Sequence, residues 1–571
     1  MRISKKAQEW FVADFETTSK VYYDKHGYAK VWLWAVCDSN TEIVGCGDSI
    51  ESFMEWLEQH SGALVYFHNL KFDGSFILNY LLENKFRYDD DLHANDPRGF
   101  SALLGDMGEW YQVKINFTNR VHVTIQDSLK IIPLKVKEIA KAFKLPIEKE
   151  IIDYERYEIN ETTLHYIYHD VQIVAMALKY FRDQGFVRMT IGSNAFNSFK
   201  EESGLPHTTF PKLDRDWLKE WRGAYRGGRS QVNPRFANEI LHDVRRYDIN
   251  SMYPYTMCAC PMPFGLPIEC NIPGIYNFEL YDIDIDFDLK NGHLPTLLKT
   301  ASIFSKAGDS YYKSTDGIIN IKISNIDLEL VKRHYSINYI KYNKIYGFKT
   351  RADIFKEWVM KYYNLKAVSE GGLRLLYKLI INNLYGKFGS RPTGQNKVPY
   401  LGPNGLEYEL TDEHDMGIYY LPVAIAVTSY AHRLIDDAIM TTGYDNFVYC
   451  DTDSVHTLGT LPDSMVDSKE IGKFKLESTE KISKYIRQKC YIYKEYSEKK
   501  KQDEWSITCA GMPESLKDYL VRMHGDDVIN AFRVGLHLDE NSEGITRKDM
   551  KLRPMQVKGG CVLAPVPFSL N

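Results

Sequence analysis

Two pairs of acidic residues, each spaced i, i+2 in an apolar and β-prone run, could do chemistry in this 571-residue sequence. One pair is Asp14 and Glu16 in FVADFETT, and the other is Asp451 and Asp453 in NFVYCDTDSVHTLG. On a strand the side chains alternate, so one face of the second run would carry Phe447, Tyr449, Asp451, Asp453 and Val455. Two carboxylates about 7 Å apart on an apolar face repel each other and lose hydration, so they need a cation or a proton.

Another acidic run provides a contrast. The run YDIDIDFDL (Tyr281 to Leu289) puts four aspartates on one wholly polar strand face, opposite isoleucine and phenylalanine side chains. Solvent can hydrate such a face, so we expect no metal there.

Further candidates follow the first pair along the chain. Asp73 in YFHNLKFDGSFIL comes at the end of an expected apolar strand, and Tyr166 and Asp170 in YIYHDVQIV share one helical face. Four carboxylates and a tyrosine from separate elements can converge on two divalent cations that activate a water for phosphodiester hydrolysis, with Tyr166 orienting that water. Hard oxygen ligands suit Mg²⁺ or Mn²⁺.

The second pair has a partner acid, Asp248, at the end of the strand expected in YDINSMYP. The helical run LYKLIINNLYGKF places Lys378, Asn382 and Tyr385 at i, i+4 and i+7, on one continuous face. Carboxylates of this kind hold two metal ions that neutralise a triphosphate and activate a primer hydroxyl, while Lys378 offsets charge on the leaving pyrophosphate. The sequence therefore predicts two phosphoryl-transfer centres.

The elements that must position these residues divide the chain in two. Strand-like and helical runs alternate up to about Arg188 and predict a mixed α/β domain. A second unit follows, with a strand in VRRYDINSMYP, a β-rich region to about Asp353 and a strongly helical stretch from Ile354 to Lys387. The length of 571 residues also predicts several domains.

Composition and charge exclude some classes of protein. The sequence has no run of about 18 uncharged apolar residues and no signal-peptide pattern, so we expect an intracellular protein without a membrane span. The nine cysteines lack paired CxxC spacing and are expected to be reduced thiols. A net charge of −5 argues against a histone-like polycation, but basic patches such as KYIRQKCYIYK are compatible with nucleic-acid binding.

The ordered set DxE, NxxxD and YxxxD resembles the three motifs of the proofreading 3′–5′ exonucleases in family B DNA polymerases. The resemblance implies that the metal ligands are Asp14, Glu16, Asp73 and Asp170. Lys149 would lie near the scissile phosphate. The residues that would contact the single-stranded 3′ end are His68, Asn69, Phe72, Ser128 and Leu129.

Three other segments look like polymerase motifs A (Asp248 to Pro254), B (Lys378 to Lys387) and C (Tyr449 to Ser454) of the same family. The implied metal ligands are Asp248, Ile249 and Asp453. Asp451 would be a further catalytic residue that supports this site. The implied nucleotide-binding residues are Ile249, Tyr253, Lys366, Lys378, Asn382 and Tyr385. The implied DNA contacts are Lys489 and Tyr491 in a KxY motif, and Tyr225, Gly227 and Gly228 in YRGG, a linker motif that couples polymerisation to editing.

The closer resemblance is to the protein-primed branch, of the phi-29 phage type. Matches run nearly end to end and include FHNLKFDGSF, AYRGG, NNLYGKFGS, KVPYL, CAGM and MQVKGG. The resemblance implies an RNase H-like exonuclease domain followed by a right-hand polymerase domain with two insertions. The implied partners are primer–template DNA, dNTPs and a terminal protein that provides the first hydroxyl. The chain would act as a monomer or as a heterodimer with that protein, in the cytoplasm of a bacterial host if a phage encodes it.

The same resemblance sets the expected domain limits. They are residues 1–188 for the exonuclease, 189–260 and 422–509 for the palm, 261–353 for a first insertion that contacts terminal protein or DNA, 354–389 for the fingers, 390–421 for a second insertion and 510–571 for the thumb. In the second insertion, KVPYL and LEYEL flank the turn signal GPNG, so we expect a β-hairpin. That hairpin would either move freely at the surface or close around DNA as a clamp that supports strand displacement.

Three other functions stay open at this point. A nuclease with a degenerate second domain would explain the first acid set, but not Asp248, Lys378, Asp451 and Asp453. A reverse transcriptase would more often show adjacent aspartates in its third motif and no exonuclease set. A non-enzymatic replication factor that binds nucleic acid needs the basic patches but neither acid set.

Overall fold

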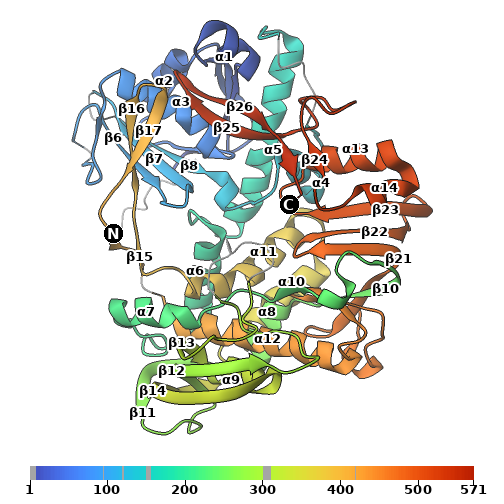
Figure 1. Cartoon of the computed structure of the whole chain (residues 1–571). Coiled ribbons are helices and arrows are strands. Elements are labelled where there is room, and N and C mark those ends of the chain that lie inside the picture. Colours follow the sequence, from blue (N-terminus) through green and yellow to red (C-terminus); the bar gives the residue numbers. More distant parts are fainter. Residues whose placement is uncertain are drawn as a thin grey trace.

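The computed structural model describes residues 8–93, 95–118, 121–149, 156–299, 310–417 and 419–570. Three large sheets follow one another from the top to the bottom of Figure 1, and helices pack between them. No helix within the described ranges has the length and apolarity that crossing a bilayer requires.

The N-terminal part is built on an eight-stranded sheet with the order β3-β2-β1-β4-β8-β7-β6-β5. Its strands are β1 (Trp10–Thr17), β2 (Val31–Asp38), β3 (Ile43–Gly47), β4 (Leu64–Phe67), β5 (Arg87–Tyr88), β6 (Gly99–Leu104), β7 (Trp110–Asn116) and β8 (His122–Asp127). Its helices are α1 (Lys20–His26), α2 (Ile50–Glu58), α3 (Leu70–Glu83), α4 (Val136–Phe143) and α5 (Glu161–Asp183). The mixed α/β pattern predicted for this part is confirmed.

Strand β1 separates two hydrophobic cores. Phe11, Ala13 and Phe15 pack in the core that contains α2 and α3. Val12 packs on the opposite side, in the core that contains α5. Because side chains alternate along a strand, the side chains of Asp14 and Glu16 lie on the α5 side of β1.

A seven-stranded sheet, with the order β23-β22-β21-β10-β20-β19-β9, forms the second layer. Its strands are β9 (Ser230–Val232), β10 (Ile240–Ile249), β19 (Phe447–Asp451), β20 (Ser454–Thr457), β21 (Phe474–Arg487), β22 (Cys490–Ser497) and β23 (Gln502–Cys509). Helix α12 (Leu421–Thr442) packs Ile435 and Ile439 onto the buried side chains of β10 and β19, next to α8 (Met252–Ala259). The sheet thus brings residues near position 248 against residues near position 453.

The third sheet lies at the bottom of Figure 1 and has the order β11-β14-β12-β13. Its strands are β11 (Met262–Cys270), β12 (Phe278–Leu289), β13 (Ile319–Ser324) and β14 (Tyr335–Arg351), and helix α9 (Asn325–His334) interrupts the region that the sequence predicts as β-rich. The apolar residues of β12 are buried opposite its aspartates, as expected. The prediction that solvent hydrates the whole acidic face is wrong at Asp282. This side chain is buried and forms an ion pair at 3.0 Å with Lys322 of the neighbouring β13.

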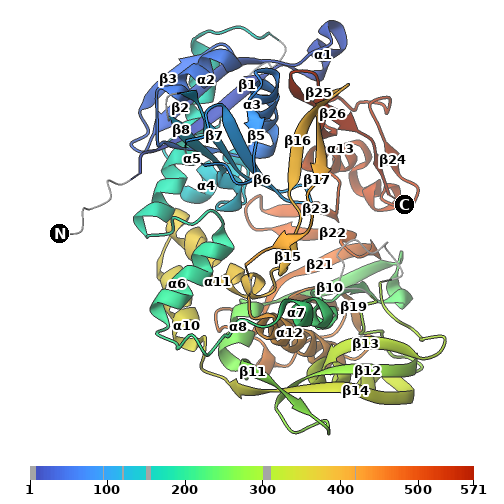
Figure 2. The ribbon, with the colours of Figure 1, turned by 90° about the vertical axis from the view of Figure 1, so that its left-hand side faces the viewer.

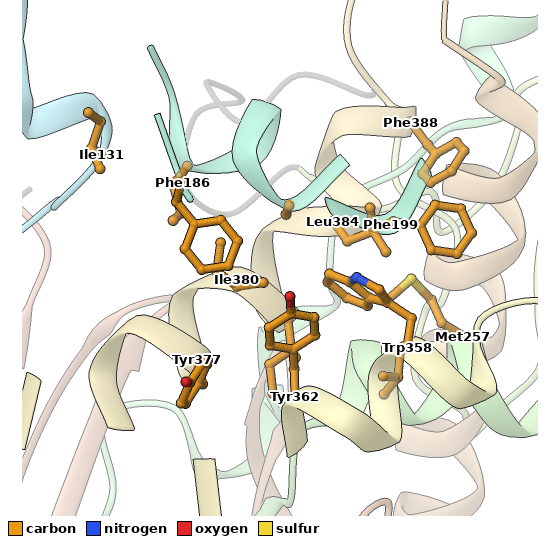
Figure 3. Close-up of a cluster of buried hydrophobic side chains, with 14 of the residues drawn as sticks. Ile131, Phe186, Phe199, Met257, Trp358, Tyr362, Tyr377, Ile380, Leu384 and Phe388 are labelled. Atoms are coloured by element: carbon orange, nitrogen blue, oxygen red, sulfur yellow. The ribbon is translucent and has the colours of Figure 1, made fainter. Parts of the chain in front are cut away.

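The largest hydrophobic core joins the N-terminal part to helices later in the chain. These helices include α6 (Ile191–Glu202), α7 (Arg215–Trp221), α10 (Lys356–Val368) and α11 (Gly371–Phe388). Figure 3 shows Phe186 and Phe199 from the first 200 residues beside Trp358 and Tyr362 of α10 and Leu384 of α11. The helical stretch predicted from residue 354 is therefore two helices, and both pack on the N-terminal part.

Two β-hairpins meet above the second sheet. The first consists of β16 (Lys397–Gly402) and β17 (Gly405–Leu410), which confirms the predicted hairpin, and it is flanked by β15 (Thr393–Gly394) and β18 (His414–Asp415). The second consists of β25 (Lys551–Val557) and β26 (Gly560–Val566), and the C-terminal region also contains α13 (Glu514–His524), α14 (Val528–Ala531), β24 (His537–Leu538) and β27 (Phe568–Ser569). Figure 2 shows both hairpins beside the N-terminal sheet.

The first hairpin is packed in place rather than free. Leu406 is buried in the core of the N-terminal sheet, and a Cβ on Gly405 would come within 2.4 Å of the Val557 carbonyl oxygen in the second hairpin. At its base, Arg391 forms an ion pair at 2.6 Å with Asp106. The first hairpin therefore contacts both the second hairpin and the N-terminal part. The predicted domain limits stay predictions.

A buried ionic cluster holds the third sheet to the second. Asp436 of α12 is fully buried and lies 2.8 Å from Arg229, 2.7 Å from Arg333 and 2.9 Å from His334. Burial opposes ionisation of this carboxyl group, but the hydrogen bond from His334 and the charge of Arg229 lower its pKa below the usual range. The Asp436 carboxylate therefore contacts Arg229, Arg333 and His334 at the same time.

Replacement of this anion should destabilise the protein. Asp436→Asn leaves the Arg229 charge buried without a counter-ion, which typically costs about 3–5 kcal/mol. We expect urea denaturation, followed by tryptophan fluorescence, to show a loss of this size. Asp445→Asn is the control because the Arg235–Asp445 ion pair is exposed, and it should shift the transition little. Equal transitions for the two variants would contradict the prediction.

Candidate active sites

The first acid set gathers where α5 covers β1. Asp14 and Glu16 stand two residues apart on β1, as predicted, and Glu16 is buried. Asp73 lies in the first turn of α3 and not at the end of a strand, so this part of the prediction is wrong. The reason is that Asn69 takes a left-handed conformation, with φ 74°, and α3 starts immediately after it. A carboxylate in the first turn of a helix gains from the helix dipole.

Helix α5 supplies Tyr166 and Asp170, which share one face as predicted and are both buried. Lys149 forms an ion pair with Asp170, and its Nζ lies 4.6 Å from the centre of the Tyr166 ring. The structure thus brings the predicted lysine and tyrosine to the same acids.

Burial and mutual repulsion raise the pKa values of these carboxyl groups. Burial, followed by the charge of Asp170, raises the pKa of Asp14 to about 7. Burial and then the charge of Asp14 hold the pKa values of Glu16 and Asp73 well above the usual range. A cluster of this kind attracts a cation or a proton, as the residue spacing predicts.

A cavity of about 370 Å³ opens beside these acids. The predicted residues that line it are Asp14, His68, Asn69, Phe72, Asp73, Lys149 and Asp170. Ser128 is buried behind it, with its Oγ 2.9 Å from His68 Nδ1, and Leu129 N donates a hydrogen bond to Asp127 at 3.0 Å. Burial lowers the pKa of His68 to about 4, so its imidazole is neutral at pH 7.

Part of the wall of this cavity comes from the C-terminal tail, a contact that the sequence does not predict. Leu552, Pro554 and Leu563 of the β25–β26 hairpin line the cavity. The available signal was the run MQVKGG, because Gly559 and Gly560 have positive φ values of 85° and 151° in the turn of this hairpin. The sequence marks the turn, but it does not say which surface the hairpin covers.

The run that contains Asp451 and Asp453 is a hairpin and not the predicted single strand. β19 ends at Asp451, and Thr452 and Asp453 form the two-residue turn into β20. Thr452 has φ 60°, the left-handed conformation that such a tight turn requires. Asp453 therefore does not share one strand face with Asp451 as predicted, although the apolar residues around the turn are buried as expected.

This turn brings Asp453 to Asp248. Ile249 N donates a hydrogen bond to Asp453 O at 2.8 Å, and Asp248 is paired with Ser454 across β10 and β20. Burial, followed by the charge of Asp453, raises the pKa of Asp248 to about 7. Burial also raises the pKa of Asp453, and the charge of Lys378 partly offsets the rise.

One face of α11 borders the same acids. The predicted residues on that face are Lys378, Asn382 and Tyr385. Lys378 and Asn382 are exposed, and the Tyr385 ring lies 4.2 Å from the Tyr253 ring at an interplanar angle of 32°. Lys366 of α10 donates a hydrogen bond to Ser251 Oγ at 3.1 Å. The helix face predicted from spacing is thus open to solvent beside Asp453.

Lys489 reaches this site from the turn between β21 and β22. Its Nζ lies 2.7 Å from both carboxylate oxygens of Asp451, and its backbone N donates a hydrogen bond to Tyr449 OH at 3.1 Å. The half-buried Tyr491 stacks on Tyr485, with ring centres 5.1 Å apart. The predicted DNA contact of Tyr491 therefore stays a prediction.

The YRGG segment packs against both α11 and the β19–β20 turn. A Cβ on Gly389, at the end of α11, would come within 2.7 Å of the Tyr225 ring. A Cβ on Gly228 would come within 2.9 Å of the Thr452 side chain. Thr452 N also donates a hydrogen bond, at 2.7 Å, to the carbonyl oxygen of Arg229, the residue that directly follows the segment. YRGG therefore fixes the turn that holds Asp453.

His432 of α12 holds the same segment from the other side. Its Nε2 lies 2.6 Å from Gly227 O and its Nδ1 lies 2.9 Å from Asp327 Oδ1. The imidazole thus links the linker motif to α9 of the third sheet.

Cations already balance part of the charge in each acid set. Lys149 lies on Asp170 and Lys489 lies on Asp451. Among the residues that the structure describes, no three His, Cys, Asp or Glu side chains form a group that could hold a metal ion as they stand. The donor type still suits Mg²⁺ or Mn²⁺, because carboxylate oxygens are their preferred ligands. The metal ligands stay predictions.

Comparisons with known proteins place the chain in a family. The model of the type B DNA polymerases, organellar and viral, matches residues 58–158 and 102–471. The chain belongs to this family. The DNA polymerases of Bacillus phages PZA and phi29 are each 36% identical to it over 99% of the chain, and the matches cover 100% and 99% of their own lengths.

This type B polymerase is of the phi29 type in structure as well. The structure of phi29 DNA polymerase complexed with primer-template DNA and incoming nucleotide substrates matches it with a TM-score of 0.88 at 35% identity, over 99% of this chain and 100% of that one. The predicted fold class, an exonuclease domain followed by a right-hand polymerase domain, is confirmed. The family membership does not support the reverse transcriptase or the non-enzymatic replication factor.

In this polymerase, the two glycines of YRGG should differ in tolerance to substitution. Gly228→Ala forces the Thr452 side chain to move and displaces the turn that holds Asp453, so we expect primer extension to fall about tenfold or more. Gly227→Ala is the matched control, because nothing lies within 4 Å of a Cβ at that position. Single-turnover extension on a primed template measures both rates. A Gly228→Ala rate equal to that of Gly227→Ala would refute the packing argument.

Proposed function

We propose that this DNA polymerase also edits its product, by removing mismatched 3′ ends in a second active site. The observation that carries the proposal is the presence of two separate acid sets, one on β1, α3 and α5 and the other on β10 and the β19–β20 turn. Each set has the residue types of a two-metal phosphoryl-transfer centre. A nuclease with a degenerate second domain would not need the second set.

Each site would hold two Mg²⁺ or Mn²⁺ ions. The ligands would be Asp14, Glu16, Asp73 and Asp170 in the editing site, and Asp248, Ile249 and Asp453 in the polymerisation site. When bound, such ions neutralise phosphate charge and activate the attacking oxygen. The raised pKa values of Asp14 and Asp248 fit these assignments, because divalent cations relieve the repulsion that raises them.

Side chains around the acids would position the substrates. In the polymerisation site, Tyr253, whose ring packs against the ring of Tyr385, would lie under the incoming sugar and leave no room for a 2′-hydroxyl. Lys366 and Lys378 would contact the triphosphate, and Asn382 would border the nascent base pair. In the editing site, Tyr166 would orient the attacking water, beside Lys149 and the scissile phosphate.

Primer and product strands would use the remaining predicted contacts. Lys489 would leave Asp451 to hold the primer terminus, with Tyr491 on the same strand. The frayed 3′ end would pass YRGG and enter the 370 Å³ cavity between His68 and the β25–β26 hairpin. Positioning by a rigid site of this kind supplies much of the catalysis in phosphoryl transfer.

We also propose that synthesis starts from the hydroxyl of a terminal protein, in the cytoplasm of a bacterial host. The end-to-end resemblance to the phage polymerases supports this proposal, and the third sheet, at the bottom of Figure 1, would offer the surface. Incubation with a candidate terminal protein and labelled dNTPs should label that protein. A candidate from the same genome that stays unlabelled while DNA primers are extended would contradict the proposal.

The β16–β17 hairpin would act as a clamp. It is closed onto the Val557 turn and anchored through Arg391, so DNA passing between it and the second sheet would be held without base-specific contacts. Such a hold lowers dissociation and lets the protein part the downstream strands as it moves. The proposal therefore combines processive synthesis with strand displacement.

The two chemistries should be separable by mutation. Asp453→Ala removes a ligand of the polymerisation site, so we expect most extension to be lost and degradation of single-stranded DNA to survive. Asp14→Ala combined with Glu16→Ala should do the reverse. Denaturing gels of labelled primers, with and without dNTPs, measure both reactions. The editing proposal fails if the double variant still degrades single-stranded 3′ ends, and the polymerisation assignment fails if Asp453→Ala extends at the parental rate.

Removal of the hairpin should shorten products without stopping chemistry. Deletion of Gly394 to Met416 leaves both acid sets in place, so single-nucleotide addition should persist. On a primed circle, with a trap for dissociated enzyme, the intact protein should make products of kilobase length and the deletion variant much shorter ones. Equal lengths at matched single-addition activity would refute the clamp.

A further inference from the structure

Cys490 and Cys509 form a thiol pair that the proposed function does not use. Cys490 begins β22, directly after Lys489, and Cys509 ends β23. The two residues are register partners in the sheet, their sulfurs lie 3.6 Å apart, and both side chains are buried.

The backbone at this point has the spacing that a disulfide needs. Ala510 N donates a hydrogen bond to Lys489 O at 2.9 Å, so Cys490 and Cys509 form the adjacent non-hydrogen-bonded pair. The Cα atoms of such pairs are about 4.5 Å apart, within the range of about 4.4–6.8 Å found in disulfides. Rotation of the two side chains is therefore enough to bring the sulfurs into bonding distance.

The surroundings favour the reactive form of Cys509. A hydrogen bond from the Cys490 thiol lowers the pKa of Cys509, and the charges of Arg487 and Lys517 lower it further, against the effect of burial. Cys509 is 5% exposed and Cys490 is 0% exposed, so a small oxidant reaches Cys509 first. At Cys37, by contrast, burial raises the pKa of the thiol. The pair therefore differs from the isolated buried cysteines in both geometry and charge.

We infer that Cys490 and Cys509 are an oxidative modification site, at which a hydroperoxide converts two thiols into a cross-strand disulfide. With hydrogen peroxide, the Cys509 thiolate attacks one peroxide oxygen, the O–O bond breaks, and the departing hydroxide takes a proton to form water. The Cys490 sulfur then attacks the resulting sulfenic acid, so an S–S bond forms, the S–O bond breaks and a second water leaves. Two thiols are oxidised and one peroxide is reduced to two waters.

The bond would stabilise the strand that carries Lys489. Cys490 and Cys509 belong to the core that also contains Leu516 of α13, and β23 leads into that helix. A disulfide at the open end of the β22–β23 hairpin would keep Lys489 paired with Ala510 when the hairpin frays. Since a cross-link removes conformations from the opened state, opening becomes rarer.

Peptide mapping of the full-length protein tests the inference. After treatment with hydrogen peroxide, blocking of free thiols and digestion without reductant, we expect peptides that contain Cys490 and Cys509 to be linked, with the loss of two hydrogen atoms. Dithiothreitol should reverse the link. Amide hydrogen exchange across β22 and β23 should slow about tenfold or more on oxidation.

Variants make the test specific. Cys490→Ser should stop the reaction at the sulfenic or sulfinic acid of Cys509, whereas Cys37→Ser should leave the link unchanged. If Cys490→Ser does not fold, the map of the parental protein decides alone. The inference is overturned if Cys509 oxidises in the native protein without linking to Cys490, or if neither thiol reacts until the protein is denatured.

Discussion

The rest of this structure depends on one constraint, the repulsion between carboxylates that lie close together in poorly hydrated places. In both sites the acids raise the pKa values of one another, and burial adds to the effect. Asp14 and Glu16 share β1, but each set as a whole takes its acids from several elements. These elements are packed into hydrophobic cores, and a lysine from another part of the chain balances part of the charge.

Residues with a left-handed backbone conformation help to place the side chains of the two acid sites. Asn69, Ser251, Thr452 and Lys489 all have positive φ values, between 52° and 74°, without being glycine. Such conformations cost about 1–3 kcal/mol each and persist only where the surroundings enforce them. Asn69 and Ser251 precede α3 and α8, and Thr452 and Lys489 lie in turns between strands. Asn69 and Lys489 are predicted site residues, and the other two lie within two residues of one. Nine other described non-glycine residues have the same conformation, so at these four positions it shows how the side chains are placed and is not by itself a sign of function.

The parts of the sites that could be predicted from the sequence are those that depend on local spacing. Asp14 and Glu16 on β1, Tyr166 and Asp170 on α5, and the face of α11 all follow from strand or helix periodicity. Periodicity failed where one residue changed the backbone, as at Thr452, which turns an expected strand into a hairpin.

Contacts between residues that are far apart in the sequence could not be predicted from it. Nothing local indicates that Leu563, near the C-terminus, faces Asp14 across one cavity, or that Lys489 lies on Asp451. These contacts are decided by how the sheets and hairpins pack, and resemblance to known polymerases supplied only the order of motifs. The ion pair of Asp282 could not be predicted for the same reason. The lysine that neutralises this aspartate of β12 comes from β13, about 40 residues later along the chain.

The hydrophobic core of Figure 3 has a further consequence for how this chain can be divided. It runs without a break from Val12 and Phe186 to Trp358 and Leu384, across the limit expected at residue 188. A fragment cut there would expose large aromatic side chains on both new surfaces, and each half would tend to aggregate. A chimaera that takes its first domain from a relative would therefore need to carry matched residues of α6, α10 and α11 as well.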